Sequence, residues 1–396
     1  MSLKSDLSSL GFGVIGAGWM GHVHARAVAR LRHHYPELAV YPRMLAVADI
    51  LPAHRAEFRF QYGDGVEYGD VVEYDDWRDL VADPRVQVVS VTAPNSMHRE
   101  IGVAVADAGK HLWIEKPVGL GSSDTRAVAS AVESAGVRAT VGFNYRNFPA
   151  VERARQLITD GVIGTPTHAS VRTFADFAAH PGAALSWRYT IAEGGHGVLA
   201  DLGSHGFDLI RFLLGDIRAL VADTATFITT RPHAKPGVSH FEVVTGADAL
   251  YGTVENEDYL SAMIRTSSGA RVAYQADRTS VGDQCTYGFV VHGSTGQVAW
   301  DFRRSDELLL STGSGFLNQS TQLFFGTPGD GEYSRFQPGA GIAMGYDDSK
   351  VIELARLVEA ITTGVMRGAT LEDALRAAEA NEAALESVRT GLWVNV

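Results

Sequence analysis

The sequence predicts an α/β protein: a doubly wound parallel sheet, followed by an α/β region with a large, open, mainly antiparallel sheet. Three observations predict this class. Strands and helices alternate from residue 11 to residue 143, strand-like runs separated by glycine turns dominate residues 167–302, and the chain has 396 residues. That length exceeds what one hydrophobic core usually serves, so we expect two domains, residues 1–147 and 148–396.

In the amino-terminal region, short apolar runs predict strands and the periodic runs between them predict helices. The strands fall at residues 11–16, 43–49, 86–91, 111–114 and 137–143, and the helices at 21–31, 51–62, 76–81, 98–108 and 123–135. Strands that alternate with helices pair in parallel through right-handed crossovers. Their carboxyl ends therefore share one edge of the sheet, where ligands bind in open α/β folds.

The carboxyl-terminal region has a different pattern. Strands are expected at residues 167–174, 220–228, 258–266, 271–277, 287–293 and 296–302, with turn signals such as Ser267-Ser-Gly269 between them. Helices are expected at 151–160, from the glycine-rich segment 193–197 to Leu214, at 350–362 and at 371–390. Residues 314–345 are rich in Gly, Phe and Ser without a clear period, so we expect a loop there.

Charge and cysteine content exclude several classes of protein. The 34 basic and 46 acidic residues give a formal net charge of −12, so we expect no nucleic-acid partner. Cys285 is the only cysteine, which excludes an intrachain disulfide and a multi-cysteine zinc site. The sequence has no signal-peptide pattern and no apolar run long enough to cross a bilayer, which indicates a cytoplasmic, soluble protein without a membrane partner.

A glycine pattern, Gly16-x-Gly18-x-x-Gly21, lies between the first predicted strand and the first predicted helix. Its glycines permit a tight turn and the close approach of a pyrophosphate to the helix amino terminus. Asp49 ends the next strand, where a carboxylate can accept hydrogen bonds from a ribose diol. This context predicts a Rossmann dinucleotide site; the alternative is a Rossmann-like fold that binds no dinucleotide.

The residues around Asp49 favour NAD over NADP. A carboxylate repels the 2′-phosphate of NADP, and the next residues, Ile50-Leu-Pro52, offer no cationic partner. Arg55 is expected on the solvent face of its helix. His22 and His24 stand two residues apart and do not face each other on a helix, so no metal site is predicted.

Two short motifs follow buried strands at the carboxyl edge of the predicted sheet. Thr92-Ala-Pro-Asn95 follows the strand at 86–91, and Glu115-Lys116-Pro117 follows the strand at 111–114. Ligands bind at this edge, so a lysine there would reach the cleft. A plain turn and a surface lysine beside a turn proline are the alternatives.

Asp201, His205 and Asp208 are spaced i, i+4 and i+7 in a predicted helix and would share one face. Histidine is the side chain best suited to accept an alcohol proton near neutral pH, and a nearby carboxylate can orient it. A solvated Asp–His pair is the alternative. Upstream, Arg188 of Trp187-Arg188 could contact a pyrophosphate or a substrate hydroxyl, or form a surface ion pair.

Together these motifs resemble those of the glucose–fructose oxidoreductase / inositol dehydrogenase (Gfo/Idh/MocA) family. The resemblance covers nearly the whole chain. It includes the glycine loop with His24-Ala25, Ala93-Pro94-Asn95-x-x-His98, Gly109-Lys110-His111 leading to Glu115-Lys116-Pro117, Gly142-Phe-Asn-Tyr145-Arg146, Trp187-Arg188 and Asp201-x-Gly203-x-His205-x-x-Asp208. One departure is Ala93, where other members often carry Thr.

The resemblance implies a Rossmann domain that binds NAD(P), then a substrate domain that forms homodimers or homotetramers through its sheet. It implies a cis Lys116-Pro117 bond. It implies catalytic roles for Lys116, Asp201 and His205. Cofactor contacts are expected from Gly16, Gly18, Trp19, Met20, Gly21, Asp49, Ala93, Pro94, Asn95, His98, Glu115, Lys116, Trp187 and Arg188. Substrate contacts are expected from Lys116, Asn144, Tyr145, Arg188, Asp201, His205 and Asp208.

The expected reaction is NAD(P)-dependent oxidation of a ring hydroxyl of a sugar, anhydrosugar or cyclitol, with NAD as the favoured cofactor. In it His205 takes the hydroxyl proton, Lys116 hydrogen-bonds the reacting oxygen, and Asp201 holds the two in geometry. One alternative is a glycoside hydrolase that recycles its bound NAD. Another is a ligand sensor that kept the fold and lost catalysis, although the three residues together favour an enzyme.

Overall fold

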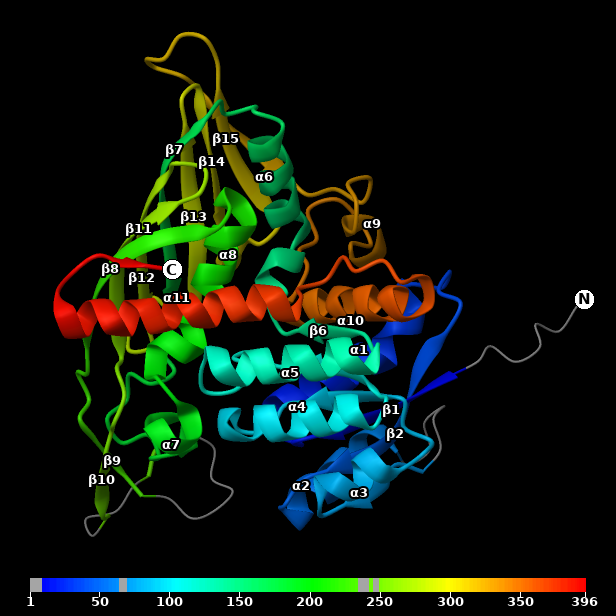
Figure 1. The fold of residues 1–396 in the computed structure, drawn as a ribbon. Coiled ribbons are helices and arrows are strands. Elements are labelled where there is room, and N and C mark those ends of the chain that lie inside the picture. The colour runs from blue at the N-terminus through cyan, green and yellow to red at the C-terminus, as the bar shows by residue number, and fades with distance from the viewer. Residues whose placement is uncertain (1–8, 64–69, 234–241, 245–248) are drawn as a thin grey trace, which may run out of the picture. The chain divides into compact units, whose positions relative to one another are not determined.

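The computed structural model describes residues 9–63, 70–233, 242–244 and 249–396 (Figure 1). The chain forms two compact units. Unit 1 comprises Met1–Gly119, Ser123–Asn147 and Gly345–Ala374, and unit 2 comprises Leu120–Ser122, Phe148–Met344 and Leu375–Val396. One segment of unit 1 ends at Asn147. The segment Gly345–Ala374, which we had assigned to the second domain, packs with unit 1 instead.

Unit 1 contains a six-stranded parallel sheet in the order β3-β2-β1-β4-β5-β6. The strand order reverses between β1 and β4, which is the switch point of a doubly wound fold. The prediction of this fold is confirmed, and β3 is the strand that the pattern missed. The strands are β1 Ser9–Ile15, β2 Tyr41–Ala48, β3 Val72–Tyr74, β4 Val88–Val91, β5 His111–Ile114 and β6 Ala139–Val141.

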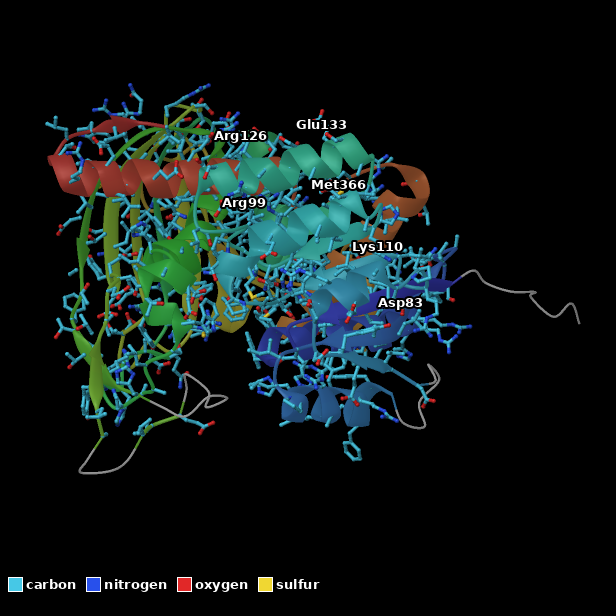
Figure 2. All side chains as sticks on the ribbon, turned by 60° about the horizontal axis from the view of Figure 1, so that its bottom comes forward. Asp83, Arg99, Lys110, Arg126, Glu133 and Met366 are labelled. Atoms are coloured by element: carbon cyan, nitrogen blue, oxygen red, sulfur yellow. The ribbon has the colours of Figure 1, made fainter. Side chains whose placement is uncertain are left out.

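Right-handed crossovers put α1 and α2 on one face of this sheet and α3, α4 and α5 on the other. In Figure 2, Arg99 of α4 and Arg126 of α5 label two neighbouring helices, which are joined by an ion pair of 3.6 Å between Arg99 and Asp124. The helices of unit 1 are α1 Trp19–His34, α2 Pro52–Tyr62, α3 Trp77–Ala82, α4 His98–Asp107, α5 Ser122–Ala135 and α10 Tyr346–Thr363.

Helix α10 reaches unit 1 from the far end of the sequence and packs along α1. Arg26 of α1 pairs with Asp347 at 2.5 Å, and Arg30 pairs with Asp348. At the opposite, amino-terminal edge of the sheet, the Lys110 ammonium donates to the carbonyl oxygens of Asp83 at 2.7 Å and Val86 at 2.5 Å (Figure 2). Lys110 therefore stabilises the amino-terminal edge of the sheet, which is opposite the edge where ligands bind.

Unit 2 is built on a nine-stranded sheet in the order β16-β15-β14-β13-β7-β12-β11-β8-β17. The described pairs of neighbouring strands in this sheet are antiparallel, except for the parallel pair β12–β7. The prediction of a mainly antiparallel sheet is therefore confirmed. The strands are β7 Pro166–Phe174, β8 Ile217–Ala225, β11 Tyr259–Thr266, β12 Arg271–Asp277, β13 Thr286–Gly293, β14 Gly296–Asp301, β15 Glu307–Thr312, β16 Thr321–Phe325 and β17 Val394–Asn395, and a separate hairpin joins β9 Thr230–Pro232 to β10 Tyr251–Thr253.

One face of the large sheet is covered and the other is open. Along β7, Ala169, Val171 and Thr173 are buried, whereas His168, Ser170 and Arg172 are exposed. The covering helices include α6 Pro149–Thr159, which contacts β14 and β15, and α8 Ser204–Leu214, which contacts β7 and β8. Helix α11 Leu371–Thr390 is joined to β8, because the Ala222 N–H donates to the Ser387 hydroxyl at 3.0 Å. In the part of the chain that the structure describes, no helix is both long and apolar enough to cross a bilayer.

Two predictions for unit 2 need correction. Residues 314–345 are not a plain loop, because they contain strand β16 and the short helix α9 Tyr333–Phe336. The predicted helix ending at Leu214 is interrupted: a short helix, α7 Ile191–Gly194, ends at Gly195, and a π-helical turn spans Leu199–Gly203 before α8 begins. Gly195 has a φ of 72°, a backbone conformation that favours glycine and ends α7.

Candidate active site

The glycine loop has the geometry of a pyrophosphate cradle. Gly16 has a φ of 95°, and a Cβ on Gly21 would lie 2.2 Å from the Gly16 carbonyl oxygen. Both positions therefore require glycine for the turn itself. A Cβ on Gly18 would meet nothing within 4 Å, so Gly18 leaves open space at the amino terminus of α1, where backbone N–H groups and the helix dipole favour a phosphate.

Asp49 is fixed beside this loop at the end of β2. Its carboxylate accepts hydrogen bonds from the backbone N–H of Ala17 at 2.8 Å and of Leu51 at 2.9 Å. The ring of His54 approaches the same carboxylate at 3.5 Å. A carboxylate can accept about four hydrogen bonds, so capacity remains for a ribose diol. Ile50, next in the chain and largely exposed, offers an apolar surface there.

The expectation that Arg55 lies on the solvent face of its helix was wrong. Its guanidinium folds back, and Nη1 donates to the Asp49 carbonyl oxygen at 2.6 Å. Nε lies 3.9 Å from Glu73, and only 14% of the side chain is exposed. Arg55 thus stiffens the end of β2, and its charge is partly met by Glu73.

Two loops at the carboxyl edge are tied to each other and to the glycine loop. The Thr92 hydroxyl donates to the Gly16 carbonyl oxygen at 2.6 Å. His98 is buried, with Nδ1 at 2.7 Å from the Pro117 carbonyl oxygen and Nε2 at 2.8 Å from that of Ala93. Burial lowers the pKa of His98, although its contacts with the two carbonyl oxygens oppose this shift.

His98 was expected to contact the cofactor. Both of its ring nitrogens face protein carbonyls, so the structure makes it a brace between the loop at Ala93-Pro94-Asn95 and the turn at Glu115-Lys116-Pro117. Asn95 itself is buried, whereas Ala93 and Pro94 are partly exposed. These two residues are the ones in this loop that keep surface for a ligand.

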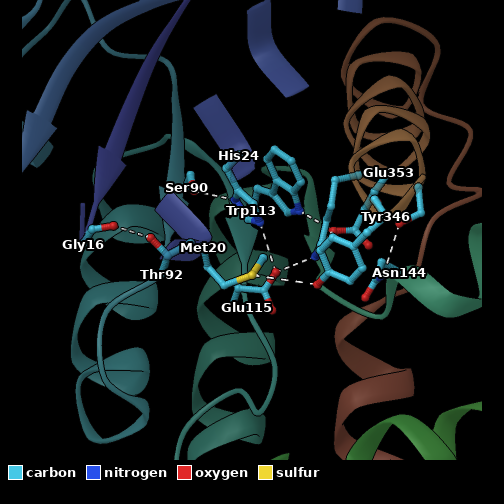
Figure 3. A network of polar contacts seen from close by, with 12 residues as sticks. Gly16, Met20, His24, Ser90, Thr92, Trp113, Glu115, Asn144, Tyr346 and Glu353 are labelled. Carbon is cyan, nitrogen blue, oxygen red and sulfur yellow. Dashed lines mark hydrogen bonds and ion pairs between the residues drawn. The ribbon is translucent and has the colours of Figure 1, made fainter. Parts of the chain in front are cut away.

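Lys116 lies at the carboxyl end of β5, half-buried, and the Lys116-Pro117 bond is cis as the resemblance implied. Its neighbour Glu115 was expected to contact the cofactor. The structure instead buries the Glu115 carboxylate, whose Oε1 lies 3.0 Å from His24 Nε2 and 2.5 Å from the Lys350 ammonium (Figure 3). Lys350 was not identified from the sequence, because it stands 235 residues further along the chain.

Four of the predicted residues of unit 1 gather around Tyr346 of α10, which the sequence analysis also missed. The Tyr346 ring centroid lies 5.7 Å from that of Trp19 and 6.4 Å from that of Tyr145, and its hydroxyl lies 3.8 Å from the Met20 sulfur. Asn144 is fully buried; its Nδ2 donates to the Ser349 hydroxyl at 3.1 Å, and its Oδ1 has no hydrogen-bond partner in the described structure (Figure 3).

In unit 2, Asp201 lies in the π-helical turn, whereas His205 and Asp208 lie in α8. Only His205 and Asp208 therefore share one face of a regular helix, and the prediction that Asp201 belongs to the same regular helix was wrong. Asp201 is partly exposed, and the other two side chains are buried. A π-helical turn is rare and frequently marks a functional site.

Tyr274 of β12 contacts the carbonyl groups of this π-helical turn. Its hydroxyl lies 3.2 Å from the Leu202 carbonyl oxygen and 3.3 Å from that of Gly203, and 2.8 Å from the Thr173 hydroxyl. Gly206 makes the approach possible, because a Cβ there would lie 2.1 Å from the tyrosine ring. Tyr274 had no signal in the sequence beyond its place in a strand.

Unit 2 also brings Arg188 and Asp201 together. Arg188 Nη1 lies 3.8 Å from Asp201 Oδ2, and the guanidinium lies over the Trp187 ring at 4.5 Å from its centroid. Asn256 holds this segment, since its Nδ2 donates to the carbonyl oxygens of Arg188 at 2.9 Å and Gly195 at 2.8 Å. Arg188 thus forms an ion pair with a residue of the π-helical turn, and its expected contact with cofactor or substrate stays a prediction.

The chain belongs to the GFO/IDH/MocA family of oxidoreductases. Residues 10–143 match the family model described as oxidoreductase family, NAD-binding Rossmann fold, and residues 151–299 match the GFO/IDH/MocA C-terminal domain. The resemblance seen in the sequence motifs is thereby confirmed. The protein is an NAD-binding oxidoreductase.

Two curated relatives span nearly the same length. The chain is 30% identical over 394 residues to levoglucosan dehydrogenase of Pseudarthrobacter phenanthrenivorans, covering 98% of this chain and 99% of that protein. It is 28% identical over 381 residues to inositol 2-dehydrogenase of Rhizobium meliloti, covering 95% and 96%. Among solved structures, levoglucosan dehydrogenase in complex with NADH and levoglucosan is similar with a TM-score of 0.89 and 29% identity, covering 98% of this chain and all of that chain (100%).

Proposed function

We propose that the protein is an NAD-dependent dehydrogenase that oxidises a ring hydroxyl of a sugar, anhydrosugar or cyclitol. The observation that carries the proposal is the glycine loop with Asp49 fixed beside it, in a chain whose relatives are named for sugar and inositol dehydrogenation. NAD fits this loop, because Gly18 leaves open space at the helix amino terminus and Asp49 can take a ribose diol. NAD, when bound, accepts the hydride.

Residues of this chain accept the proton of the reacting hydroxyl and stabilise the negative charge on its oxygen. His205 accepts the proton of the reacting hydroxyl as general base. Lys116 donates a hydrogen bond to the reacting oxygen and stabilises its developing negative charge. Asp201 orients the proton acceptor, and Arg188, paired with Asp201 at 3.8 Å, holds Asp201 in turn. Asn144, Tyr145 and Asp208, all buried, are the further residues we propose for substrate binding.

A substrate panel tests the proposed function. Sugars, anhydrosugars and cyclitols, with levoglucosan and myo-inositol among them, are incubated with NAD and with NADP, and reduced cofactor is followed by absorbance. Accumulation of NADH with one of these alcohols is the expected result. Release of an aglycone from a glycoside without net NADH would instead identify the cofactor-recycling hydrolase, and tight binding of a sugar without turnover would identify the sensor.

We expect kcat/KM for NAD to exceed that for NADP by at least about tenfold, or about 1.4 kcal/mol, the scale of one lost charged contact. The reason is the fixed Asp49 carboxylate beside the glycine loop. Asp49→Ser should narrow the difference, and Asp75→Ser, at an exposed aspartate of the same unit, should leave it unchanged. Equal kcat/KM values in the wild-type protein would show that Arg55 or His54 accommodates the 2′-phosphate.

We propose that the protein is located in the cytoplasm.

We also propose that a second copy of the chain covers the open face of the large sheet. Directly paired residues share a face, so one row of apolar residues, interrupted only by Ser170, crosses this face. The row includes Leu309 and Met263, which are 42% and 48% exposed. From β16 to β8 it consists of Leu323, Leu309, Ala299, Val290, Ser170, Ala273, Met263 and Val221.

Met263→Glu should convert the oligomer to a smaller species in size-exclusion chromatography with light scattering, because the change buries a charge against the partner. Phe60→Glu, at an exposed apolar residue of α2, should not change the mass. A wild-type protein that runs as a monomer, or a Met263→Glu variant with the wild-type mass, contradicts the proposed interface.

A further inference from the structure

Four ionisable side chains, one of them directly before Lys116 in the chain, form a buried cluster in unit 1; Figure 3 labels three of them, His24, Glu115 and Glu353. The Lys350 ammonium donates to Glu115 Oε1 at 2.5 Å and to Glu353 Oε1 at 3.0 Å. Lys350 and Glu353 come from α10, Glu115 follows β5, and the fourth member, His24, comes from α1. The cluster thus joins three elements that are far apart in the sequence.

The members of the cluster have further partners that fix them. His24 Nδ1 lies 2.7 Å from the Ser90 hydroxyl, and its ring stacks on Trp113 with centroids 3.5 Å apart. Trp113 Nε1 donates to Glu353 Oε1 at 2.6 Å, and Asn147 Nδ2 donates to Glu353 Oε2 at 3.2 Å. The Glu115 carboxylate also lies against Gly142, where a Cβ would be 2.4 Å away.

Lys350 is the cation on which the cluster depends. Burial alone would raise the pKa of Glu115, but the Lys350 ammonium and the hydrogen bond from His24 outweigh it and hold that pKa below its usual range. Burial raises the pKa of Glu353 to about 7, although Lys350 opposes this shift. Burial lowers the pKa of His24 to about 4, so His24 is neutral and supplies no positive charge. His24, Glu115 and Glu353 have the spacing of a metal site, but the ammonium already lies between the two carboxylates.

The cluster determines the place of Lys116 because it holds one side of its turn. Glu115, just before Lys116, is held by Lys350 and His24. Pro117, just after it, is held by His98 through its carbonyl oxygen. Lys116 is therefore the partly exposed residue between two residues that buried side chains fix on either side.

We propose that Lys350 is a positioning residue for the reaction: through Glu115 it fixes the Glu115-Lys116-Pro117 turn and with it the Lys116 ammonium. The proposal rests on the proposed function, in which Lys116 stabilises negative charge on the reacting oxygen. Such stabilisation requires a donor already in place, and a displacement of about 1 Å is enough to lose much of the rate. Glu353 is held in the cluster by hydrogen bonds from Lys350 and Trp113.

Two isosteric variants separate positioning from stability. Lys350→Met keeps most of the length of the side chain and removes the partner of Glu115, whereas Glu353→Gln keeps the shape of the side chain, replaces a carboxyl group of the same cluster by an amide, and leaves the Lys350–Glu115 pair. Both should lower Tm, because both disturb a buried ionic network. Lys350→Met alone should lower kcat by about tenfold or more, with the NADH Kd within about threefold of wild type. Glu353→Gln should keep kcat within about twofold.

A second readout does not depend on turnover. Trinitrobenzenesulfonate labels exposed amines, and peptide mass spectrometry gives the labelling rate of Lys116 alone. That rate should change at least about threefold in Lys350→Met and stay unchanged in Glu353→Gln, because only the first releases the turn. Unchanged labelling and kcat in Lys350→Met, or equal losses in both variants, overturn the proposal. If the wild-type protein turns over no alcohol, the proposed function fails, while the labelling rates still decide whether Lys350 positions Lys116.

Discussion

Replacing His205 by alanine should lower kcat by roughly 10²–10⁴, the usual contribution of a general base, and should barely change NAD affinity. His205 is the second residue of α8, which begins directly after the π-helical turn, and the Tyr274 hydroxyl hydrogen-bonds carbonyl groups of that turn. The imidazole is thus held by its helix before substrate arrives. Stopped-flow or steady-state absorbance of NADH measures the loss in kcat, and NADH fluorescence gives the affinity.

His180→Ala is a matched control for this variant, since it removes an exposed histidine of the same unit. We expect its kcat to stay within about twofold of wild type. A His205→Ala variant with near-normal kcat would remove His205 from the mechanism and leave Lys116 as the proton acceptor.

Replacing Lys116 by methionine should lower kcat at least about 10²-fold, because the variant keeps the length of the side chain but loses the charge that opposes the developing alkoxide. Dinucleotide binding should persist, since the glycine loop and Asp49 are untouched. Substrate KM should rise less than kcat falls, because the interaction is strongest in the transition state.

Lys110→Met provides the control at the other end of the same strand. The Lys110 ammonium binds two backbone carbonyls at the base of the sheet, so its loss should lower Tm and leave kcat within a few-fold of wild type. Should Lys116→Met turn over substrate normally, Lys116 becomes a binding contact and the assignment of the electrostatic role fails.

The features that the sequence predicted well are local. The glycine pattern, the strand before it and the helix after it lie within a short stretch, and together they define a turn whose glycines the backbone requires at Gly16 and Gly21. The alternation of strand and helix also predicts the parallel sheet, because each crossover joins neighbours in sequence. The cis bond before Pro117 came from the family resemblance rather than from this kind of reasoning.

The features that the sequence did not predict depend on distant partners. The sequence alone places Glu115 at the carboxyl edge of the sheet, where ligands bind. It does not predict that Lys350, 235 positions later, pairs with this carboxylate. Strand β16 lies in a Gly- and Ser-rich segment, and its order comes from pairing with β15 rather than from its own composition. The hydroxyl of Tyr274 hydrogen-bonds the π-helical turn at Gly203, which is 71 residues away in the sequence. Helical periodicity describes only neighbouring residues, so it could not predict this contact.

The return of α10 to unit 1 has a consequence for the order of folding during synthesis. Chains emerge from the ribosome amino terminus first, and domains generally fold as they are completed. Unit 1 is completed only by Gly345–Ala374, so the nucleotide-binding half waits for the whole of Phe148–Met344 to be made. Until then Glu115 and His24 lack Lys350, and the α1 surface lacks Asp347 and Asp348. A dissected amino-terminal half should therefore be expressed together with residues 345–374 to fold as it does in the intact chain.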